Sequence, residues 1–484
     1  MDRAGTGRSK PVEGAGMRRF LFGLLGSGLL GCTGYRAAPI DPAAEPAAYL
    51  ARRAADTALV GFMRAAGSAP DSAWHARHAA LAALYFQPEL DRMRASLDAT
   101  RAGEITAGSR PQPGATVGVE RTFSGGVAEP PWGLAIAPDL AVELGGKRGA
   151  RLAGARAQTM VSEAALRESA WRLVTGARAA TLEVLSAEED LADARAESAA
   201  LAGLIPVLEA RFREGGASRA DVAQGAQEAQ VARLGVAGAE RRQGEARASF
   251  ARATGLPAAE SDRLVLVPDS VKGCTAPEGL GADSLRALAL HSRWNLARAL
   301  DEYQVAEAGL RLQVAKQYPD LSFAPGLFFD HGANKWTLGF GLPSIPLNRN
   351  RGPIAEAEAH RAAAGSRVAE VQDSIIGDLS AAAAGCRAAE TEVTDADSLA
   401  DAVERRIEVT RAAFDRGEIP RADLVLLDVA RVRANRARHQ ARQRLAAAGL
   451  ALEAAAGIWL DARPLEWPDP AQSPRESRRK EASP

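Results

Sequence analysis

Large hydrophobic and small or polar positions alternate most regularly between residues 335 and 342 (KWTLGFGL). Trp336, Leu338 and Phe340 occupy one set of alternate positions, and a threonine and two glycines occupy the other. Alternation with a period of two predicts a β-strand with one apolar face. The preceding apolar run, residues 321–330, ends at a His-Gly-Ala-Asn segment and is the expected hairpin partner of this strand.

A second pair of strands is expected in the first half of the chain, at residues 115–123 and 132–144. The segment Ser124-Gly125-Gly126 between them has the composition of a turn. The alternation is weaker here than at 321–342, and Pro138 makes the second strand irregular.

Long helical patterns follow each strand pair. Between residues 148 and 215, apolar residues recur at spacings of seven, four and three, which predicts a coiled-coil seam: Leu166, Leu173, Ala177, Ala180, Val184 and Leu191. A helix of this length measures on the order of 100 Å. Pro206 is expected to kink or break it near the far end. Residues 352–417 predict a second helix of similar length.

The two halves of the chain resemble each other. The segment from Phe212 to Val222 matches the segment from Phe414 to Leu424, 202 residues later, and Gly255 matches Gly457 at the same offset. Several matches in the same order predict a duplication. Each copy is expected to hold a helical stretch (71–110 and 283–317), two strands, a long helix interrupted at a glycine, and a returning helix.

The N-terminus has the features of an export signal. Arg18-Arg19 precede an apolar stretch, residues 20–31, that is too short to span a bilayer as a helix. The sequence ending at Cys32 resembles a bacterial lipobox, which implies that Cys32 is lipidated and becomes the N-terminus of the mature protein. Thr33 in place of aspartate favours the outer membrane. An ordinary signal peptide with an incidental cysteine is the alternative, and Met17 is an alternative start.

Composition excludes several classes of function. Lys plus Arg and Asp plus Glu are both 60, so no net charge favours nucleic acid as a partner. The three cysteines have no zinc spacing and no disulfide framework. Cys386 is expected to be a small packing residue, with a bridge to Cys274 left open but unsupported.

Catalytic and metal motifs are absent from the sequence. It contains no HExxH, GxSxG or Cys/His constellation, so we expect no enzyme, no cofactor and no metal site. His75 and His78 are three residues apart but have no third ligand in sequence. No apolar stretch after the signal approaches 18 residues, so any membrane-spanning part is expected to consist of strands.

Two segments resemble the TolC-like outer membrane factor family, and especially its heavy-metal-efflux branch. One runs from Tyr318 to Ser322 and then from Ile345 to Ile354, where the prolines, Asn350, Arg351, Gly352 and Pro353 resemble the family's strand-to-helix junction. The other is the repeated Gly-x5-Asp-Val/Leu motif. The resemblance covers about residues 35–460.

The resemblance implies a mainly α fold with a membrane β-barrel part, in two tandem repeats of long coiled-coil helices plus two strands. Three chains would share one twelve-stranded barrel and an α-helical periplasmic tunnel. The expected boundaries are 1–31 for the signal peptide, 32–70 for a lipid-linked tail, 71–256 for the first repeat, 257–282 for a connector, 283–460 for the second repeat and 461–484 for a disordered tail.

The repeated motif implies the periplasmic tips of the tunnel, near 215–221 and 417–423. The residues expected to form the tips and to dock an adaptor are Gly215, Arg219, Asp221, Val222, Gly417, Arg421, Asp423 and Leu424. Asp423 matches the family's gate aspartate, with a simple helix-start carboxylate as the alternative; for Asp221, capping or docking is favoured over gating. Two positions depart from the family pattern: Leu426 replaces a second gate aspartate, and Leu427 replaces a small residue.

The implied function is that of an outer-membrane exit duct in a tripartite efflux system, with passive transport of small molecules or metal cations. Its partners would be two further copies, a periplasmic adaptor, an inner-membrane pump of the resistance-nodulation-division type and outer-membrane lipid. The alternatives are a periplasmic adaptor lipoprotein, which would have a single hairpin and compact β domains, and a structural coiled-coil lipoprotein.

Overall fold

A computed structural model describes residues 34–68, 70, 73–123, 131–268, 274, 281–330, 333–342 and 347–458. For Asp330, Arg421 and Ala422 only the backbone is described. The chain divides into two compact units, Met1–Ala51 and Arg52–Pro484. The described part of the first unit contains one short exposed helix, α2 (Ala44–Leu50). The predicted signal peptide and Cys32 lie outside the described residues.

The second unit consists of two repeats with the same order of elements. The first repeat contains α4 (Ala76–Phe86), α5 (Pro88–Gly108), β1 (Gly114–Arg121), β2 (Trp132–Val142), α6 (Lys147–Arg213) and α7 (Arg219–Thr254). The second contains α9 (Ala282–Ser292), α10 (Trp294–Ala315), β3 (Leu321–Asp330), β4 (Ala333–Gly341), α11 (Arg351–Asp415) and α12 (Arg421–Ala456). Helices α3 (Thr57–Ala65) and α8 (Ala258–Ser261) complete the unit. The fold is therefore mainly α, with two tandem repeats.

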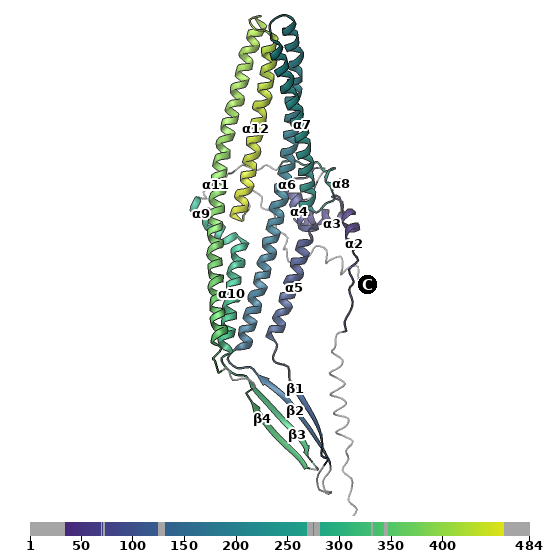
Figure 1. Ribbon diagram of the computed structural model, residues 1–484, viewed down its shortest axis with the longest axis vertical. Coiled ribbons are helices and arrows are strands. Elements are labelled where there is room, and N and C mark those ends of the chain that lie inside the picture. The colour runs from purple at the N-terminus through teal and green to yellow at the C-terminus, as the bar shows by residue number, and fades with distance from the viewer. Residues whose placement is uncertain are drawn as a thin grey trace, which may run out of the picture. The chain divides into compact units, whose positions relative to one another are not determined.

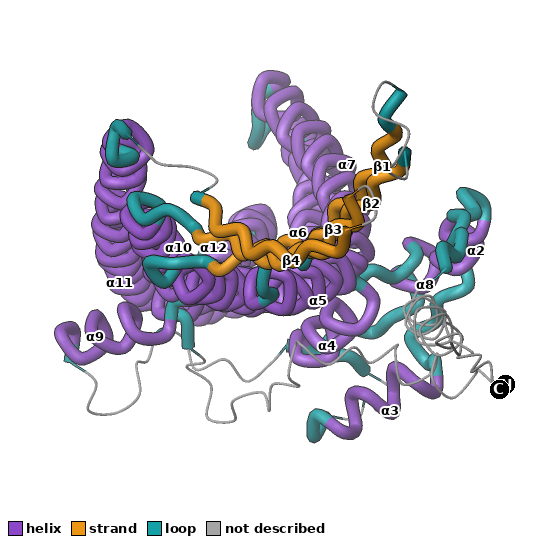
Figure 2. Tube along the Cα trace, turned by 90° about the horizontal axis from the view of Figure 1, so that it is seen from below, coloured by secondary structure: helices purple, strands orange, loops and turns teal. Residues whose placement is uncertain are grey.

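The four strands form one antiparallel sheet in the order β1-β2-β3-β4. Within the second unit the sheet extends from one end of the helical part, while the α6–α7 and α11–α12 turns lie at the other end (Figure 1). Viewed from below, the strands form one continuous layer (Figure 2).

Each repeat has its own hydrophobic core. The larger core packs α3 and α4 against the middle of α6 and the end of α7, with Leu166, Val184 and Phe250 fully buried. The second packs α9 and α10 against α11 and the end of α12, around Ile375. The predicted heptad seam lies in the first core and continues beyond it: Leu166, Ala177, Ala180, Val184 and Leu191 are all buried, and Leu173 packs against them.

In both repeats, a side chain at the corner between two helices caps the end of the returning helix. Gln87, at the corner between α4 and α5, donates from Nε2 to the carbonyls of Arg252 (2.7 Å) and Ala253 (2.9 Å) at the end of α7. Arg293, at the corner between α9 and α10, donates from Nη1 to the carbonyls of Ala454 and Ala455 at the end of α12. Both side chains satisfy carbonyls that a helix leaves without a partner at its C-terminus.

A row of polar contacts joins the repeats along α6 and α12. Glu197 of α6 accepts from Arg433 (2.8 Å) and Arg436 (2.9 Å) of α12, and Asp193 lies 3.0 Å from His439 Nδ1. Arg178 and Glu453 form an ion pair, with exposed fractions of 2% and 3%. The acids of this row lie on α6 except for Glu453, and each contact pairs a residue of one repeat with a residue of the other.

Two features differ from what the sequence predicts. Of the kink or break expected at Pro206, the break is absent, because α6 runs without interruption to Arg213. The buried Leu201 packs in a cluster with Ala229 and Val429, Ile205 packs against this cluster, and the packing offsets the hydrogen bond that proline removes. Cys386 is not merely a packing residue: it forms a disulfide with Cys274, with the two Cα atoms 5.6 Å apart.

The helical stretches expected at 71–110 and 283–317 are each two helices. Gln87 and Arg293 adopt extended backbone conformations at the corners. His75 and His78 form a capping box at the start of α4, with His75 N donating to His78 Nδ1. Among the residues that the structure describes, no group of three or more His, Cys, Asp or Glu side chains could hold a metal ion.

Candidate functional site

The two helix tips reverse through the same backbone motif. Gly215 and Gly417 adopt left-handed conformations, with φ of 78° and 74°. Gly216 N donates to Arg211 O (2.7 Å) at one tip, and Glu418 N donates to Ala413 O (2.9 Å) at the other. This six-to-one hydrogen bond, closed by a glycine, is the Schellman motif that ends many helices. The two predicted reversals are thus present, one in each repeat.

The returning helices begin differently at the two tips. In α7, Ser218 Oγ accepts from Asp221 N (3.1 Å) and Asp221 Oδ2 accepts from Ser218 N (2.7 Å), which forms a capping box. These hydrogen bonds from Ser218 lower the pKa of Asp221. In α12, the cap residue is Pro420, which has no side-chain hydrogen bond to offer.

Asp423 therefore has a different partner from Asp221. Its side chain is 44% exposed, and its Oδ1 lies 4.0 Å from Nη1 of Arg211, on the last turn of α6. This contact brings the two tips together and links the second repeat to the first. A contact at this distance between exposed side chains is weak and leaves the carboxylate accessible to cations.

The other predicted tip residues lie around these two aspartates. The guanidinium of Arg219 lies 6.0 Å from the centre of the Phe212 ring, and Val222 and Leu424 are half-buried. For Arg421 only the backbone is described, as the first residue of α12.

The family's small-residue position has a packing role at both tips, where Gly225 matches the pattern and Leu427 departs from it. A β-carbon at Gly225 would lie 2.6 Å from Leu208 Cδ1, so glycine lets α7 pack closely on α6. Leu427, at the matching position in α12, is 4% exposed and is a core residue. Leu426 is 48% exposed and places an apolar side chain where the pattern has an acid.

The junction between strands and helices is built from left-handed residues in both repeats. Gly145 and Gly146 precede α6, with φ of 72° and 77°; Arg349 and Asn350 precede α11, with φ of 50° and 54°. Asn350 Nδ2 donates to Gln313 O (2.8 Å) of α10 and fixes the start of α11 against its neighbour. Arg351, Gly352 and Pro353 form the first turn of α11.

An ion pair ties the start of α6 to the crossing between α10 and β3. Lys147 Nζ lies 2.7 Å from Asp320 Oδ1, which also accepts from Leu144 N. Lys147 is 9% exposed, and it joins the start of α6 to the residue just before β3. Asp320 belongs to a motif that is visible in the sequence, whereas no sequence pattern pointed to Lys147.

The sheet has two chemically different faces. The strand register places Val119, Leu134, Phe329 and Trp336 on one face, together with the other large apolar residues of the strands. The large apolar residues on this face are Val117, Val119, Trp132, Leu134, Ile136, Leu140, Val142, Leu321, Phe323, Leu327, Phe329, Trp336, Leu338 and Phe340, and the same register adds Ala115, Arg121, Pro138, Pro325 and Asn334. Most of them are exposed, including Phe340 at 74% and Val119 at 68%.

The opposite face carries mainly glycine, alanine, serine and threonine, with Glu120, Asp139 and Lys335 as charged residues and Phe328 as the exception. An exposed apolar face of this extent is unusual for a chain in water and is typical of a surface that contacts another protein, a ligand or a membrane. Within the described parts of the chain, no helix combines the length and the apolar character needed to cross a bilayer.

Comparisons with solved structures assign this architecture to a known fold. The chain is similar to the outer membrane protein VceC from Vibrio cholerae, with a TM-score of 0.64 and 17% identity over 80% of this chain and 97% of that one. It is similar to the outer-membrane channel OprN, with a TM-score of 0.66 and 16% identity over 88% and 99%. The CmeC outer membrane channel from Campylobacter jejuni gives 0.64 and 13% over 84% and 89%.

The chain has the fold of these outer membrane channels. No protein-family model matches the sequence, and no curated protein matches it either. The shared architecture is therefore visible in three dimensions at sequence identities that fall below 20% for all three neighbours.

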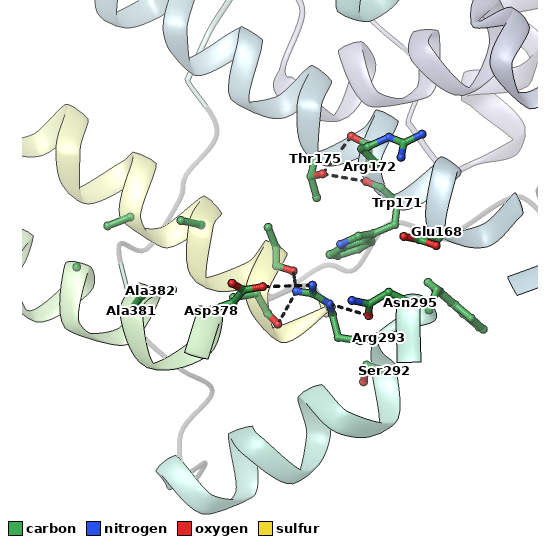
Figure 3. A pocket seen from close by; sticks show the side chains of 17 residues that line it. Glu168, Trp171, Arg172, Thr175, Ser292, Arg293, Asn295, Asp378, Ala381 and Ala382 are labelled. Atoms are coloured by element: carbon green, nitrogen blue, oxygen red, sulfur yellow. Dashed lines mark hydrogen bonds and ion pairs between the residues drawn. The ribbon is translucent and has the colours of Figure 1, made fainter. Parts of the chain in front are cut away.

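A groove of about 650 Å³ within this channel fold is structural. It lies where α6, the α9–α10 corner, α11 and α12 meet, and Figure 3 shows Arg293 at its centre, between Asp378 and the end of α12. Arg293 Nη2 lies 3.6 Å from Asp378 Oδ2, and its Nη1 donates to the two α12 carbonyls. Because these donors already have partners within the chain, Arg293 serves to close the second repeat.

Sequence patterns located the aspartates and glycines of the tips but missed their partners. Ser218 was detectable, since serine three residues before an acid is a capping signal. Arg211 had no such signal, because its contact with Asp423 joins residues from different repeats.

Proposed function

We propose that this chain is one protomer of a trimeric outer-membrane exit duct and a member of the TolC-like family. The duct would carry small molecules or metal cations passively from the periplasm to the exterior. The chain would act as a conduit and not as an enzyme. The outer membrane channel fold supports this proposal, as does the amphipathic sheet at one end of the long helices.

The sheet is the single observation that carries the proposal. Its apolar face suits contact with lipid, and its small and polar face suits a lumen that contains water. Among the described residues, β1 and β4 each have one edge without a strand partner, and a lipid phase does not tolerate such edges. Three copies of the four-stranded sheet could close into one barrel of twelve strands.

The helices would form a periplasmic tunnel that narrows at the tips. The adaptor would dock on the tip residues Gly215, Arg219, Asp221, Val222, Gly417, Arg421, Asp423 and Leu424, and a ring of three Asp423 carboxylates would line the entrance. An inner-membrane pump of the resistance-nodulation-division type would supply the cargo and choose it. Adaptor docking would shift the tips toward the open state.

The N-terminal part of the chain would attach the protein to the membrane. Lipidation of Cys32 after removal of residues 1–31 would anchor each protomer in the outer membrane. The basic and apolar segments before Cys32 support this step.

The two alternative functions fit the architecture less well. A periplasmic adaptor was expected to have one helical hairpin, whereas this chain has two, α6–α7 and α11–α12. A structural coiled-coil lipoprotein gives no reason for an exposed apolar sheet.

A pair of neighbouring substitutions tests the proposal. Ile136→Lys places a charge on the apolar face near the middle of β2, and Ala137→Lys places the same charge on the opposite face. A lysine that faces the middle of the bilayer costs about 2–4 kcal/mol, whereas a lysine that faces the lumen is tolerated. We expect Ile136→Lys to reduce the amount of trimer recovered in vesicles, and Ala137→Lys to leave it close to the wild-type amount.

The matched variant makes the result specific. If both lysine variants lost the same amount of trimer, the two faces of the sheet would lie in the same environment. That result would contradict a membrane-spanning sheet.

A further inference from the structure

The chain passes between sheet and helices four times, and each crossing carries basic residues. Arg110 lies between α5 and β1, and Lys147 and Arg148 follow β2. Lys316 lies between α10 and β3, and Arg349 and Arg351 lie between β4 and the first turn of α11. Figure 1 shows the four crossings at one level of the second unit, where the strands leave the helices.

The acidic residues at these crossings are already engaged. Asp320 is paired with Lys147 at 2.7 Å, and Glu143 is paired with Arg151. The sequence of the crossings contains no other carboxylate. The basic residues therefore exceed the acidic ones at this level of the molecule.

Four basic residues at the crossings do not take part in these ion pairs. Arg110, Lys316, Arg349 and Arg351 are exposed and have no carboxylate partner within the described ranges. Arg148 is also exposed, and its Nε donates to the carbonyl of Gly108. We define the four residues Arg110, Lys316, Arg349 and Arg351 as the basic belt.

Arg349 occupies a position that favours glycine. Its φ of 50° lies in the left-handed region, which a β-carbon disfavours. The corresponding pair in the first repeat is Gly145-Gly146, with φ of 72° and 77°. A left-handed conformation costs free energy for a residue other than glycine. The presence of arginine at position 349 therefore indicates a function for its guanidinium group.

Apolar and aromatic side chains accompany the belt. Tyr318 is 58% exposed, Leu342 is 50% exposed and Leu347 is 93% exposed, all at the same crossings. Leu342 directly follows β4, and Tyr318 and Leu347 are each two residues from a cation of the belt in the sequence. A border of tyrosine, leucine and basic residues beside an apolar surface is typical of the region where a bilayer meets water.

We propose that the basic belt binds the phosphate groups of phospholipids in the leaflet on the side of the helices, with a preference for anionic headgroups. Guanidinium groups donate two parallel hydrogen bonds to phosphate, and a lysine ammonium adds a flexible point charge. The belt would fix the depth at which the sheet sits in the membrane. The inference rests on the proposed function, because it requires the sheet to span the outer membrane.

The test uses the full mature protein, purified in a neutral detergent. Phosphatidylglycerol and phosphatidylcholine are added at equal concentrations, and native mass spectrometry counts the lipids that each trimer retains. We expect the wild-type protein to retain phosphatidylglycerol roughly fivefold or more over phosphatidylcholine. The variant Arg110→Gln/Lys316→Gln/Arg349→Gln/Arg351→Gln should lose this preference while it keeps the trimer mass.

A matched variant controls for the loss of charge itself. Arg233, Arg405, Arg406 and Arg411 are exposed and also have no carboxylate partner in the described part of the chain, but they lie on α7 and α11. Their replacement by glutamine should leave the lipid preference unchanged. If the fourfold belt variant fails to form trimers, Lys316→Gln and Arg349→Gln alone should each lower the preference.

The outcomes separate this inference from the proposed function. A wild-type trimer that conducts current but shows no preference between the lipids would overturn the belt and leave the duct intact. An equal loss in the control variant would also overturn it. A chain that forms no trimer would instead overturn the duct, and the belt with it.

Discussion

The aspartates at the two helix tips occupy matching positions but have different surroundings. Asp221 is held by Ser218, whereas Asp423 follows a proline cap and has only Arg211 nearby, at 4.0 Å, among the residues that the structure describes. The duplicated positions have therefore diverged. The first favours a fixed helix start, and the second favours an accessible charge.

The capping box at Asp221 predicts a dependence on pH. Because hydrogen bonds from Ser218 lower the pKa of Asp221 below its ordinary value of 3.8, the carboxylate stabilises the start of α7 above that pH. This stabilisation is lost as the pH falls through the lowered pKa. Ser218→Ala should reduce hydrogen-exchange protection of the first turn of α7 roughly fivefold at about pH 7.

The same measurement provides its own control. The first turn of α12, which has no side-chain cap, should be unaffected by Ser218→Ala. The difference between wild type and variant should shrink as the pH falls below 3.8 and through the lowered pKa of Asp221, after correction for intrinsic exchange rates. A difference that grows toward low pH would contradict a lowered pKa for Asp221.

At Asp423 the expected effect concerns ions. If three Asp423 carboxylates ring the entrance, Asp423→Ala should weaken the block of single-channel current by divalent cations about tenfold, because a ring of carboxylates concentrates cations. Asp221→Ala, which removes a capped carboxylate, should change the block much less. Unchanged conductance and block in Asp423→Ala would remove this residue from the gate.

At the scale of residues, the sequence predicts contacts between neighbours in the chain but does not predict contacts between residues of different repeats. The glycines of the tip turns and the aspartates of the helix starts follow rules that act within a few residues. Arg211 with Asp423 and Arg178 with Glu453 are pairs from different repeats. Their register depends on how α6 packs on α12, which no local pattern encodes.

At the scale of elements, periodicity was a reliable guide and single residues were not. The heptad positions of α6 are buried as expected, and the alternation of β2 is as regular as that of β4 once its register with β3 is known. Pro206 misled the prediction because proline propensity is local, whereas the surrounding helix is stabilised by packing. The prediction for Cys386 was wrong because its disulfide partner, Cys274, lies 112 residues away in the sequence.

The disulfide predicts a measurable contribution to stability. It attaches the segment before α9 to the middle of α11 across a loop of 112 residues. Its reduction should lower the free energy of unfolding by about 2–4 kcal/mol, because the reduced unfolded chain regains conformational freedom. Denaturant unfolding with and without a reductant measures this difference.

A variant without the two cysteines separates the disulfide from other effects of the reductant. Cys274→Ser/Cys386→Ser should unfold at the same denaturant concentration with or without the reductant. Peptide mapping of the unreduced wild-type protein should recover the two cysteines as one linked pair, and recovery of two thiols would contradict the disulfide.

At the scale of the whole molecule, each repeat is closed by its own core and by its own cap on the returning helix. Gln87 and Arg293 are different residues that perform the same contact at equivalent corners. The row of polar contacts along α6 and α12 then joins the repeats. In the described part of the chain, the sheet remains incomplete, because β1 and β4 each have an unpaired edge and one face exposes apolar side chains.

The trimeric duct requires three copies of the chain to complete this sheet in a membrane. Planar-bilayer conductance of the purified mature protein, with its oligomer mass measured in the same detergent, tests this requirement. We expect a trimer that forms discrete, cation-preferring channels. A monomer or dimer that gives no conductance would contradict it and would favour an adaptor or a structural coiled-coil lipoprotein.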